Sequence, residues 1–463
     1  MNVEVGFCLG VTQTLVDYAI GLRYEDIPTD VVEKAKACIL DSLGCGFGGY
    51  KTELGGIVIE QIKEMGGARQ ATLLGDGGQV PCAQAAFANA ALMNALDYDE
   101  TFVNVGHPGS TLIPAAIAVG EHLRISGAKL IEAIVAAYEV NIRIGTAIQP
   151  SPERFKHVWF VGTHQTFGAV TAAGKLLGLD KLQMADAFGI AGVTSPLPNS
   201  QAWGHPQHWV KEPTAWPAHS GVLAAQLAKR GFVGNRAVLE GENGYWIMAG
   251  SDRCDFDAMV EGLGRDYRLL DMSFKPYPSC RMTHSALDAV RDLVNTHKIT
   301  PDQVKHVVVK ISSALLTQVF EDYTPTTFVD AEFSIPYVTA LVLMGVEPGA
   351  KWYDKKTLQD SEVLGLAKRV RLEPDDEADG AFFNDHKIVA TVEISTESGK
   401  KLSARKEIAR GDPENPMTEE EFLGKFRALT GGVLSADRLD KLIGFVKSIE
   451  AAKDISPLGL YFR

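Results

Sequence analysis

The sequence lacks the features that mark several large classes of protein. Its six cysteines, in 463 residues, include no CxxC pair and no metal-ligand spacing, which argues against a disulfide framework and a structural zinc site. No uncharged apolar stretch reaches about 18 residues, so no membrane span is expected. The N-terminus lacks the basic and apolar segments of a signal peptide. These absences together predict a cytoplasmic protein.

Positive charge is also scarce. The chain carries 45 Lys and Arg residues against 58 Asp and Glu residues, a formal net charge of −13. Nucleic-acid binding needs a basic stripe, and none is present, so no nucleic-acid partner is expected. The common nucleotide, hydrolase and zincin motifs (GxGxxG after a strand, P-loop, GxSxG, HExxH) are absent too. Hydrophobic residues nevertheless make up 46% of the chain, enough for a large core.

Hydrophobic periodicity predicts a mostly α protein. Up to about residue 268 it predicts helices at 11–24, 29–48, 83–97, 111–126, 129–147, 163–177, 180–193 and 217–231. Beyond this point it predicts helices at 283–297, 333–345 and 356–368, and strands at 305–312, 369–374, 387–396 and 400–409, the last three joined by short polar turns. Helices return at 418–428 and 436–452. We therefore expect a large all-helical domain formed by both chain ends (1–268 and 411–463) and a smaller inserted α+β lid domain (269–410).

The first segment with candidate chemistry follows the helix at 83–97. Asp97-Tyr-Asp-Glu-Thr101 leads into the loop Gly106-His107-Pro-Gly-Ser-Thr. His107 lies on non-helical backbone, where it could act as a general acid or base, or bind a substrate carboxylate. Asp97 and Thr101 are four residues apart and would share a helix face. A polar helix end with an ordinary loop histidine is an equal alternative.

A second segment, with His205, His208 and Lys211, is rich in Trp, Pro and His. An HxxH pair without a third ligand is weak support for a metal. Lys211 falls in a predicted loop, where aromatic neighbours would strengthen its pairing with an anion by excluding water. The alternative is an ordinary solvated lysine.

The third segment contains Lys275, Arg281 and His284, and two prolines restrain the backbone around Lys275. Lys, Arg and His near a helix N-terminus favour an anion, because the free backbone N–H groups add to the positive charge. A domain-junction turn with a surface lysine is the alternative. Tyr337 follows Phe-Ser-Ile-Pro at a helix start, where it could donate a hydrogen bond from rigid backbone or be a core aromatic.

These segments, in this order, resemble the MmgE/PrpD family, whose members include 2-methylcitrate dehydratase, cis-aconitate decarboxylase and iminodisuccinate epimerase. The similarity runs through IPTDVVEKAKACILDSLGCGFGG, ALDYDET, GHPGST, GTHQTFGAVTAAGKLLGLD, SFKPYPSCRMTHSALDA and FSIPY. It implies a two-domain subunit in a homodimer. It also implies an active site between the two domains that uses neither a metal nor an organic cofactor.

The resemblance further implies roles for residues that match the motifs and for their neighbours. The catalytic set comprises His107, Lys275, Asp97, Tyr337 and Lys211. The substrate-binding set comprises Thr101, Arg281, His284, His164 and His157. Together they would form a cationic, hydrogen-bonding pocket for a small polycarboxylate, with His107 transferring the proton.

One position departs from the family pattern. Members commonly carry a second catalytic His nine residues before the Gly of a Gly-Ala pair, and here that position is Trp159. Either His157 or His164 substitutes, or the reaction differs. The leading prediction is a cofactor-independent lyase, a dehydratase or decarboxylase, that moves a proton at a carbon next to a carboxylate of a small di- or tricarboxylate. An epimerase of an iminodisuccinate-like dicarboxylate, favoured by Trp159, and a catalytically silent binding protein are the alternatives.

Overall fold

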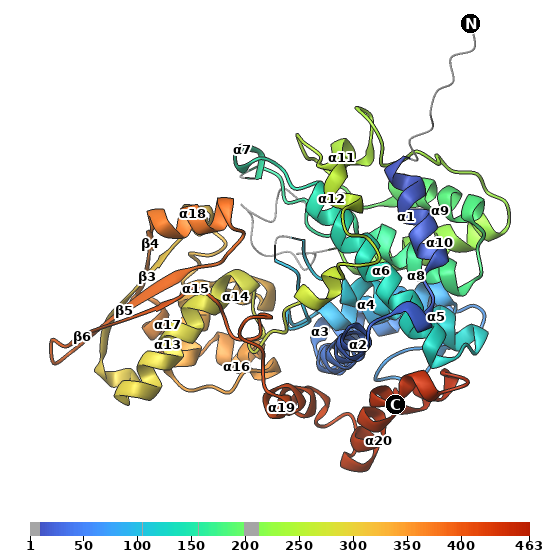
Figure 1. Cartoon of the computed structure of the whole chain (residues 1–463). Helices are drawn as coiled ribbons and strands as arrows, with labels where there is room; N and C mark the ends of the chain where they lie inside the picture. The colour runs from blue at the N-terminus through green and yellow to red at the C-terminus, as the bar shows by residue number, and fades with distance from the viewer. Residues whose placement is uncertain (1–9, 104, 156, 199–212) are drawn as a thin grey trace, which may run out of the picture.

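A computed structural model describes residues 10–103, 105–155, 157–198 and 213–463, and most of them are helical. A compact group of helices forms one part of the molecule, and a small sheet with its own helices forms the other (Figure 1). The prediction of a mostly α protein with a smaller α+β part is confirmed. Among the described residues, no helix is long and apolar enough to cross a membrane.

The helical part is organised around α8, which contacts α5, α6, α9 and α10. Its long helices are α1 (Val11–Gly21), α2 (Thr29–Tyr50), α3 (Glu53–Met65), α4 (Cys82–Asn94), α5 (Gly109–Leu123), α6 (Gly127–Ala147), α8 (Gln165–Leu176), α9 (Lys181–Thr194) and α10 (Ala215–Lys229). Shorter elements are strands β1 (Ala71–Thr72) and β2 (Gln79–Val80) and helices α7 (Pro152–Phe155), α11 (Tyr245–Met248) and α12 (Phe256–Val260). Each helix predicted in this region is present, with its ends shifted by a few residues.

Small side chains let these helices approach closely. Where α10 meets α8, a Cβ on Gly221 would lie 2.5 Å from Ala169 Cβ and 2.7 Å from Val170 N, closer than van der Waals contact allows. A larger residue at Gly221 would push the two helices apart and lose dispersion contacts along the crossing. The tight packing holds α8, and the loop that precedes it, in place.

The C-terminal helices α19 (Glu419–Thr430) and α20 (Ala436–Lys447) return to pack on α2, close to the N-terminus in sequence. Lys36 of α2 donates to the carbonyl of Lys447, the last residue of α20, and to Glu450, which holds the end of α20 against α2. A helical unit formed by both chain ends requires contacts of this kind between N-terminal and C-terminal helices. The boundaries 1–268, 269–410 and 411–463 stay a prediction.

The other part of the molecule is built on a four-stranded sheet of order β4–β3–β5–β6. Its strands are β3 (Val304–Ile311), β4 (Val370–Pro374), β5 (Ala390–Thr396) and β6 (Lys401–Lys406). β3 and β4 are parallel, and the other neighbours are antiparallel. On β3, Val307, Val309 and Ile311 alternate toward one buried face, as expected of a strand with one side against the core.

Helices α13 (His284–His297) and α15 (Ile335–Leu343) accompany this sheet, and α13 packs directly on β5 and β6 (Figure 1). The remaining helices of this part are α14 (Phe328–Phe333), α16 (Lys355–Leu358), α17 (Ser361–Ala367) and α18 (Asp376–Asn384). The crossover from β3 to β4 carries α14 to α17, because parallel strands cannot be joined by a tight turn.

Three local predictions are wrong. The connection between β4 and β5 is not a short turn but contains α18. Asp375 caps the start of this helix, because its side chain accepts the N–H of Ala378. The N-terminal region is not all helical, because Ala71–Thr72 pairs with Gln79–Val80. Asp97 and Thr101 do not share a helix face, since α4 ends at Asn94. Asp97 has a φ of 47°, a left-handed conformation that turns the chain away from the helix.

Candidate active site

The loop between α4 and α5 presents His107. Thr101 forms an antiparallel bridge with Ser273, and the two exchange backbone hydrogen bonds of 2.9 Å. The loop then turns back on itself at Gly106, whose φ of 115° suits glycine and whose backbone pairs with Phe102. His107 follows directly, just before α5 begins. Its backbone carbonyl accepts a hydrogen bond from Ser110, so the histidine is held at both its main chain and its side chain.

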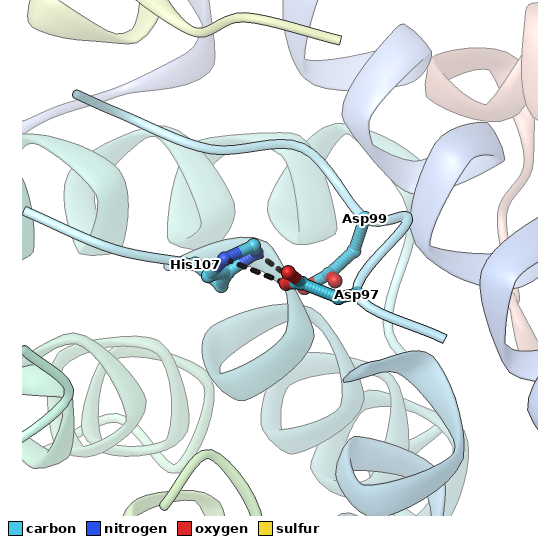
Figure 2. Close-up of side chains that lie close together, drawn as sticks. All are labelled: Asp97, Asp99 and His107. Atoms are coloured by element: carbon cyan, nitrogen blue, oxygen red, sulfur yellow. Dashed lines mark ion pairs between the residues drawn. The ribbon is translucent and has the colours of Figure 1, made fainter. Parts of the chain in front are cut away.

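Two carboxylates flank the imidazole of His107. Its Nε2 lies 3.2 Å from Asp97 Oδ1, and its Nδ1 lies 3.1 Å from Asp99 Oδ2 (Figure 2). Asp99 is fully buried and His107 is 8% exposed, so the ring lies at the edge of the buried cluster, with one side toward a cavity. The two buried anions next to the ring stabilise its protonated form.

Lys275 completes this cluster. Its Nζ donates to Asp97 Oδ1 at 2.9 Å and to the Asp97 backbone carbonyl at 2.8 Å, and its side chain is fully buried. A buried ammonium of this kind is stable only with such partners. The sequence analysis placed Lys275 at the substrate; in the structure it contacts Asp97 and does not line the cavity beside His107.

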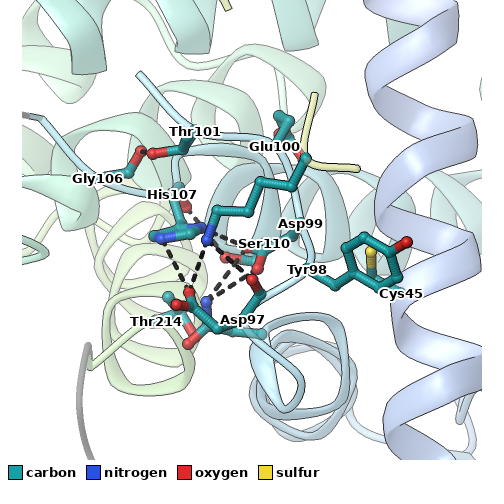
Figure 3. Close-up of polar contacts among 12 residues, drawn as sticks. Cys45, Asp97, Tyr98, Asp99, Glu100, Thr101, Gly106, His107, Ser110 and Thr214 are labelled. Atoms are coloured by element: carbon teal, nitrogen blue, oxygen red, sulfur yellow. Dashed lines mark hydrogen bonds and ion pairs between the residues drawn. The ribbon is translucent and has the colours of Figure 1, made fainter. Parts of the chain in front are cut away.

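The sequence analysis included Asp99 in the acidic segment before His107 but did not name it among the site residues. Asn94, in the last turn of α4, donates from Nδ2 to both oxygens of Asp99, at 3.1 and 3.2 Å. Burial alone would raise the pKa of Asp99, but the positive charges of His107 and Lys275 outweigh it and leave the pKa lowered. Asp99 is therefore an ionised, fully buried carboxylate against His107 (Figure 3). The only signal for it in the sequence was its place two residues after Asp97.

Arg281 approaches the same place from the segment before α13. Its guanidinium pairs with Asp412 and donates to the backbone carbonyl of Arg410 at 3.2 Å. It also lies 3.1 Å from His284 Nδ1. Since a guanidinium only donates, Nδ1 accepts, and the His284 Nε2–H donates to the Ser279 carbonyl at 3.1 Å. Burial and the charges of Arg281 and Lys275 lower the pKa of His284 well below its usual range, so His284 is a neutral orienting group.

A cavity lies between the two parts of the molecule at this point. Its empty volume, including the open mouth, is about 530 Å³. One wall comes from the helical part and the other from the segments around α13, α14 and β5. The polar lining includes Asp97, Thr101, His107 and Arg281, and the apolar lining includes Trp159 and Phe333.

The other predicted residues lie in different settings. His164 is fully buried, and burial lowers its pKa to about 3. Its Nε2 would be 2.4 Å from a Cβ on Gly145, so the ring lies against α6. His157 is exposed. The buried Tyr337 donates its hydroxyl to the Trp352 carbonyl at 2.6 Å. The side chains of His157, His164 and Tyr337 do not line the cavity, whereas Trp159 does.

Lys211 and the pair His205 and His208 lie outside the described residues. Their predicted contributions to catalysis or to metal binding stay predictions. Thr101, predicted to bind substrate, does line the cavity, and its hydroxyl donates to the Gly106 carbonyl at 2.9 Å.

The Asp97, Asp99 and His107 donor atoms lie within 4.8 Å of one another, which is close enough to surround a metal ion. However, the ammonium of Lys275 already contacts Asp97, so the cluster carries its own positive charge. The expectation of a site without a metal stays a prediction.

Further acidic groups lie beneath the loop. Glu100 is fully buried and accepts the Tyr138 hydroxyl at 2.5 Å. Burial and the charges of Asp41 and Asp99 raise the pKa of Glu100 to about 8, so it is largely protonated at neutral pH. In Figure 3 Glu100 lies apart from the His107 ring.

Comparisons with known proteins find similarity over most of the chain. The MmgE/PrpD N-terminal domain matches residues 13–256, and the MmgE/PrpD C-terminal domain matches residues 277–450. The cis-aconitate decarboxylases of Aspergillus terreus and Homo sapiens are each 27% identical to this chain, over 97% of it and over 95% and 93% of their own lengths. The 2-methylcitrate dehydratase of Salmonella typhi is 24% identical over 77% of the chain and 76% of its own length.

Proposed function

Because this chain belongs to the MmgE/PrpD family, we propose that it is a lyase that acts on a small di- or tricarboxylate. The decarboxylases and the dehydratase that resemble it are lyases by name, and two of the decarboxylases match it nearly end to end. This similarity supports cis-aconitate as the first substrate to test, with 2-methylcitrate second.

The observation that carries the proposal is that His107 and Arg281 both line the same cavity. Arg281 is a cation held in place by Asp412, His284 and the Arg410 carbonyl, and its position in the cavity lining suits a substrate carboxylate. His107 is a proton-transfer group whose ring is restrained by Asp97 and Asp99. A substrate carboxylate on Arg281 would place its neighbouring carbon toward His107.

This arrangement suits proton transfer next to a carboxylate. Negative charge that develops at such a carbon spreads onto the carboxylate oxygens, so a cation there lowers the barrier, by about 3–4 kcal/mol for one key donor. General acid–base catalysis by a positioned histidine contributes about 10²–10⁴-fold. Lys275 acts one step away, by holding the Asp97 carboxylate against His107.

For cis-aconitate the proposed reaction is decarboxylation. The C–C bond to one carboxylate breaks, CO₂ leaves, and the electron pair remains on the carbon that lost it. The His107 imidazolium then gives its proton to the carbon chain, and the product is an unsaturated dicarboxylate with five carbons. A dehydratase instead needs an acid for the leaving hydroxyl, a second role that His107 would serve in its protonated form.

The remaining predicted residues keep the roles implied by the family resemblance. We propose that Asp97, Lys211 and Tyr337 contribute to catalysis, and that Thr101 binds the substrate at the cavity wall. His157, His164 and His284 are proposed to support substrate binding. We also propose a cytoplasmic homodimer that works without an organic cofactor or a metal.

The alternative is an epimerase of an iminodisuccinate-like dicarboxylate. It is supported by Trp159, which lines the cavity at the place where the family commonly has a second catalytic His. An indole cannot exchange a proton at neutral pH, so a reaction that needs two proton-transfer groups would need another partner here. An epimerase needs no leaving group, and its second proton-transfer group, on the opposite face of the carbon from His107, would have to be a residue other than Trp159.

A substrate panel distinguishes these functions. The full chain is incubated with cis-aconitate, 2-methylcitrate, citrate and iminodisuccinate, while absorbance at 240 nm follows the alkene, a coupled assay follows CO₂, and NMR in D₂O follows exchange at the carbon next to the carboxylate. A lyase changes the alkene or CO₂ signal. Exchange and loss of stereochemistry without either signal would establish the epimerase and overturn the lyase. Binding of carboxylates with no turnover would indicate a silent binding protein.

A further inference from the structure

We propose that Asp412 is a positioning residue that holds Arg281 at a fixed place relative to His107, by joining the two connections of the chain between the helical part and the sheet. This inference rests on the binding of a substrate carboxylate by Arg281 proposed above. Asp412 does not line the cavity beside His107, so it acts on a ligand there only through the Arg281 guanidinium.

The two connections lie against each other. The chain leaves the helical part through residues 272–280, which precede Arg281 and α13, and it returns through residues 407–418, between β6 and α19. The Phe274 N–H donates to the Gly411 carbonyl at 2.9 Å. The contact is close, because a Cβ on Gly411 would lie 1.8 Å from the Phe274 carbonyl oxygen. A shift of one connection therefore moves the other.

Asp412, the residue after Gly411, contacts both connections and Arg281. Its Oδ1 accepts the Ser273 hydroxyl at 2.6 Å, its Oδ2 accepts the Ala409 N–H at 3.2 Å, and its carboxylate pairs with the Arg281 guanidinium. Arg281 is only 6% exposed, and a cation so deeply buried needs an anion held next to it. The Asp412 carboxylate is held in this way by its other two partners.

Ser273 connects this carboxylate to the loop that presents His107. The backbone of Ser273 exchanges hydrogen bonds of 2.9 Å with Thr101, which belongs to that loop. A continuous series of contacts thus runs from the loop through Ser273 and Asp412 to Arg281. Because the proton-transfer group and the cation come from different parts of the molecule, this series sets the distance between them.

Arg281 would have other anions to pair with if Asp412 did not hold it. It also lines a second cavity, together with Asp412 and further acidic residues, among them Asp271 and Glu407. Opposite charges attract more strongly where water is partly excluded. A guanidinium released from Asp412 would therefore turn toward these carboxylates and away from the substrate.

The first test measures binding rather than turnover. The probe is tricarballylate, a saturated tricarboxylate without an alkene, and calorimetry gives its Kd for the full chain. Asp412→Asn keeps the size of the side chain but removes its charge, so the Kd should rise about 10-fold. In an Arg281→Gln background the same substitution should change the Kd by less than about twofold, because it has no guanidinium left to release.

Equal losses of affinity in the two backgrounds would overturn the proposal, since Asp412 would then act independently of Arg281. A Kd of Asp412→Asn within about twofold of the wild type would overturn it as well. The matched control is Asp186→Asn, which removes the charge from another aspartate–arginine pair, Asp186 with Arg236, outside the cavity. This control should bind tricarballylate as the wild type does.

Ser273→Ala tests the link to His107 while the ion pair stays intact. The substitution removes one hydrogen bond to Asp412 and keeps the backbone contacts with Thr101, so the variant should fold. Its kcat with cis-aconitate should fall about 10-fold, because Arg281 is displaced relative to His107, while the Kd for tricarballylate changes less than about threefold. A kcat within about twofold of the wild type would overturn the link.

The two measurements separate this inference from the proposed lyase. If the wild type binds tricarballylate through Arg281 and Asp412 but turns over no substrate of the panel, the positioning role stands and the lyase is overturned. If the protein is an active lyase and Asp412→Asn binds tricarballylate as the wild type does, the lyase stands and this inference is overturned.

Discussion

The Nζ of Lys425 lies 2.6 Å from Asp41 Oδ1, although the two residues are 384 positions apart in the chain. Lys425 comes from α19 and Asp41 from α2, and both side chains are almost fully buried. The same ammonium donates to the backbone carbonyl of Tyr98 at 2.6 Å, between Asp97 and Asp99. A C-terminal helix therefore supports the loop that carries the candidate site.

Replacing one partner of this ion pair should destabilise the protein strongly. Lys425→Met leaves a buried carboxylate without its cation, which should lower the free energy of unfolding by about 3–5 kcal/mol. Urea denaturation measures this. In the double variant Asp41→Asn with Lys425→Met the loss should be smaller than in Lys425→Met alone, since the uncompensated charge is gone.

The control for this pair is Lys441→Met, which removes an exposed ion pair with Asp437. Its effect should stay below about 1 kcal/mol. Equal effects of the two lysine substitutions would contradict a structural role for the buried pair.

His107→Gln should abolish most turnover. The amide fills a similar space but cannot exchange a proton at neutral pH, so kcat should fall about 10²–10⁴-fold. Turnover of cis-aconitate is measured by CO₂ release, and substrate binding by calorimetry. The variant should still bind the substrate, because Arg281 is unchanged. A kcat near that of the wild type would refute His107 as the proton-transfer group.

Arg281→Lys should weaken substrate binding more than it slows the chemical step. An ammonium cannot reproduce the planar pair of N–H donors, so KM should rise about 10-fold or more. Arg291→Lys is the control, because Arg291 pairs with Asp288 outside the cavity. An unchanged KM in Arg281→Lys would show that the substrate carboxylate binds elsewhere.

Trp159 is expected to act as an apolar wall. Trp159→Ala enlarges the cavity and removes contact area, so KM should rise about 10-fold. Trp159→Phe keeps an aromatic face and should retain activity close to that of the wild type. If Trp159→Phe is as impaired as Trp159→Ala, the indole N–H has a specific role that an apolar wall does not explain.

Acid should destabilise the protein through His164. Burial lowers its pKa to about 3 from an ordinary value near 6.5, so between these pH values the unfolded chain binds a proton that the folded protein does not. The stability is therefore complete above about pH 6.5 and falls with decreasing pH, by up to about 1.4 kcal/mol per pH unit from this group. Urea denaturation at pH 7.5, 6.5 and 5.5 measures the fall.

In His164→Gln the fall should be smaller, because the titrating ring is absent. His284, whose pKa is also lowered, remains in both proteins and contributes equally to their slopes. Parallel curves of stability against pH for the two proteins would contradict the prediction.

Much of the fold was predictable because local periodicity determines it. The long helices have apolar stripes, and their predicted ends are correct within a few residues. The exceptions have local causes. The helix α3 was not predicted, because the pair Gly55 and Gly56 weakens its helical pattern. In the structure, the Thr52 side chain caps this helix by accepting the N–H of Gly55. The helix α18 was not predicted either, because its acidic first turn has the composition of a polar loop, and the Asp375 cap is apparent only in the structure.

The candidate site was predictable only in part. Motif resemblance indicated His107 and Arg281, which do line one cavity. It did not indicate that Lys275 contacts Asp97, or that Asp99 contacts His107. Both facts depend on the left-handed turn at Asp97, which a sequence pattern does not specify. Lys425 left no local signal at all, because its partner is 384 residues away.

The contact between α19 and α2 also determines when, during synthesis, the protein can complete its folding. At about 5–20 residues per second, a ribosome needs about 20–80 s to add the 384 residues that separate Asp41 from Lys425. Throughout that time the nascent helical part holds a carboxylate without its cation, and the loop with His107 lacks the support of Lys425. The loop that carries His107 can therefore reach its final arrangement only when synthesis is almost complete, and a chain that ends before α19 should be a substrate for chaperones and proteases.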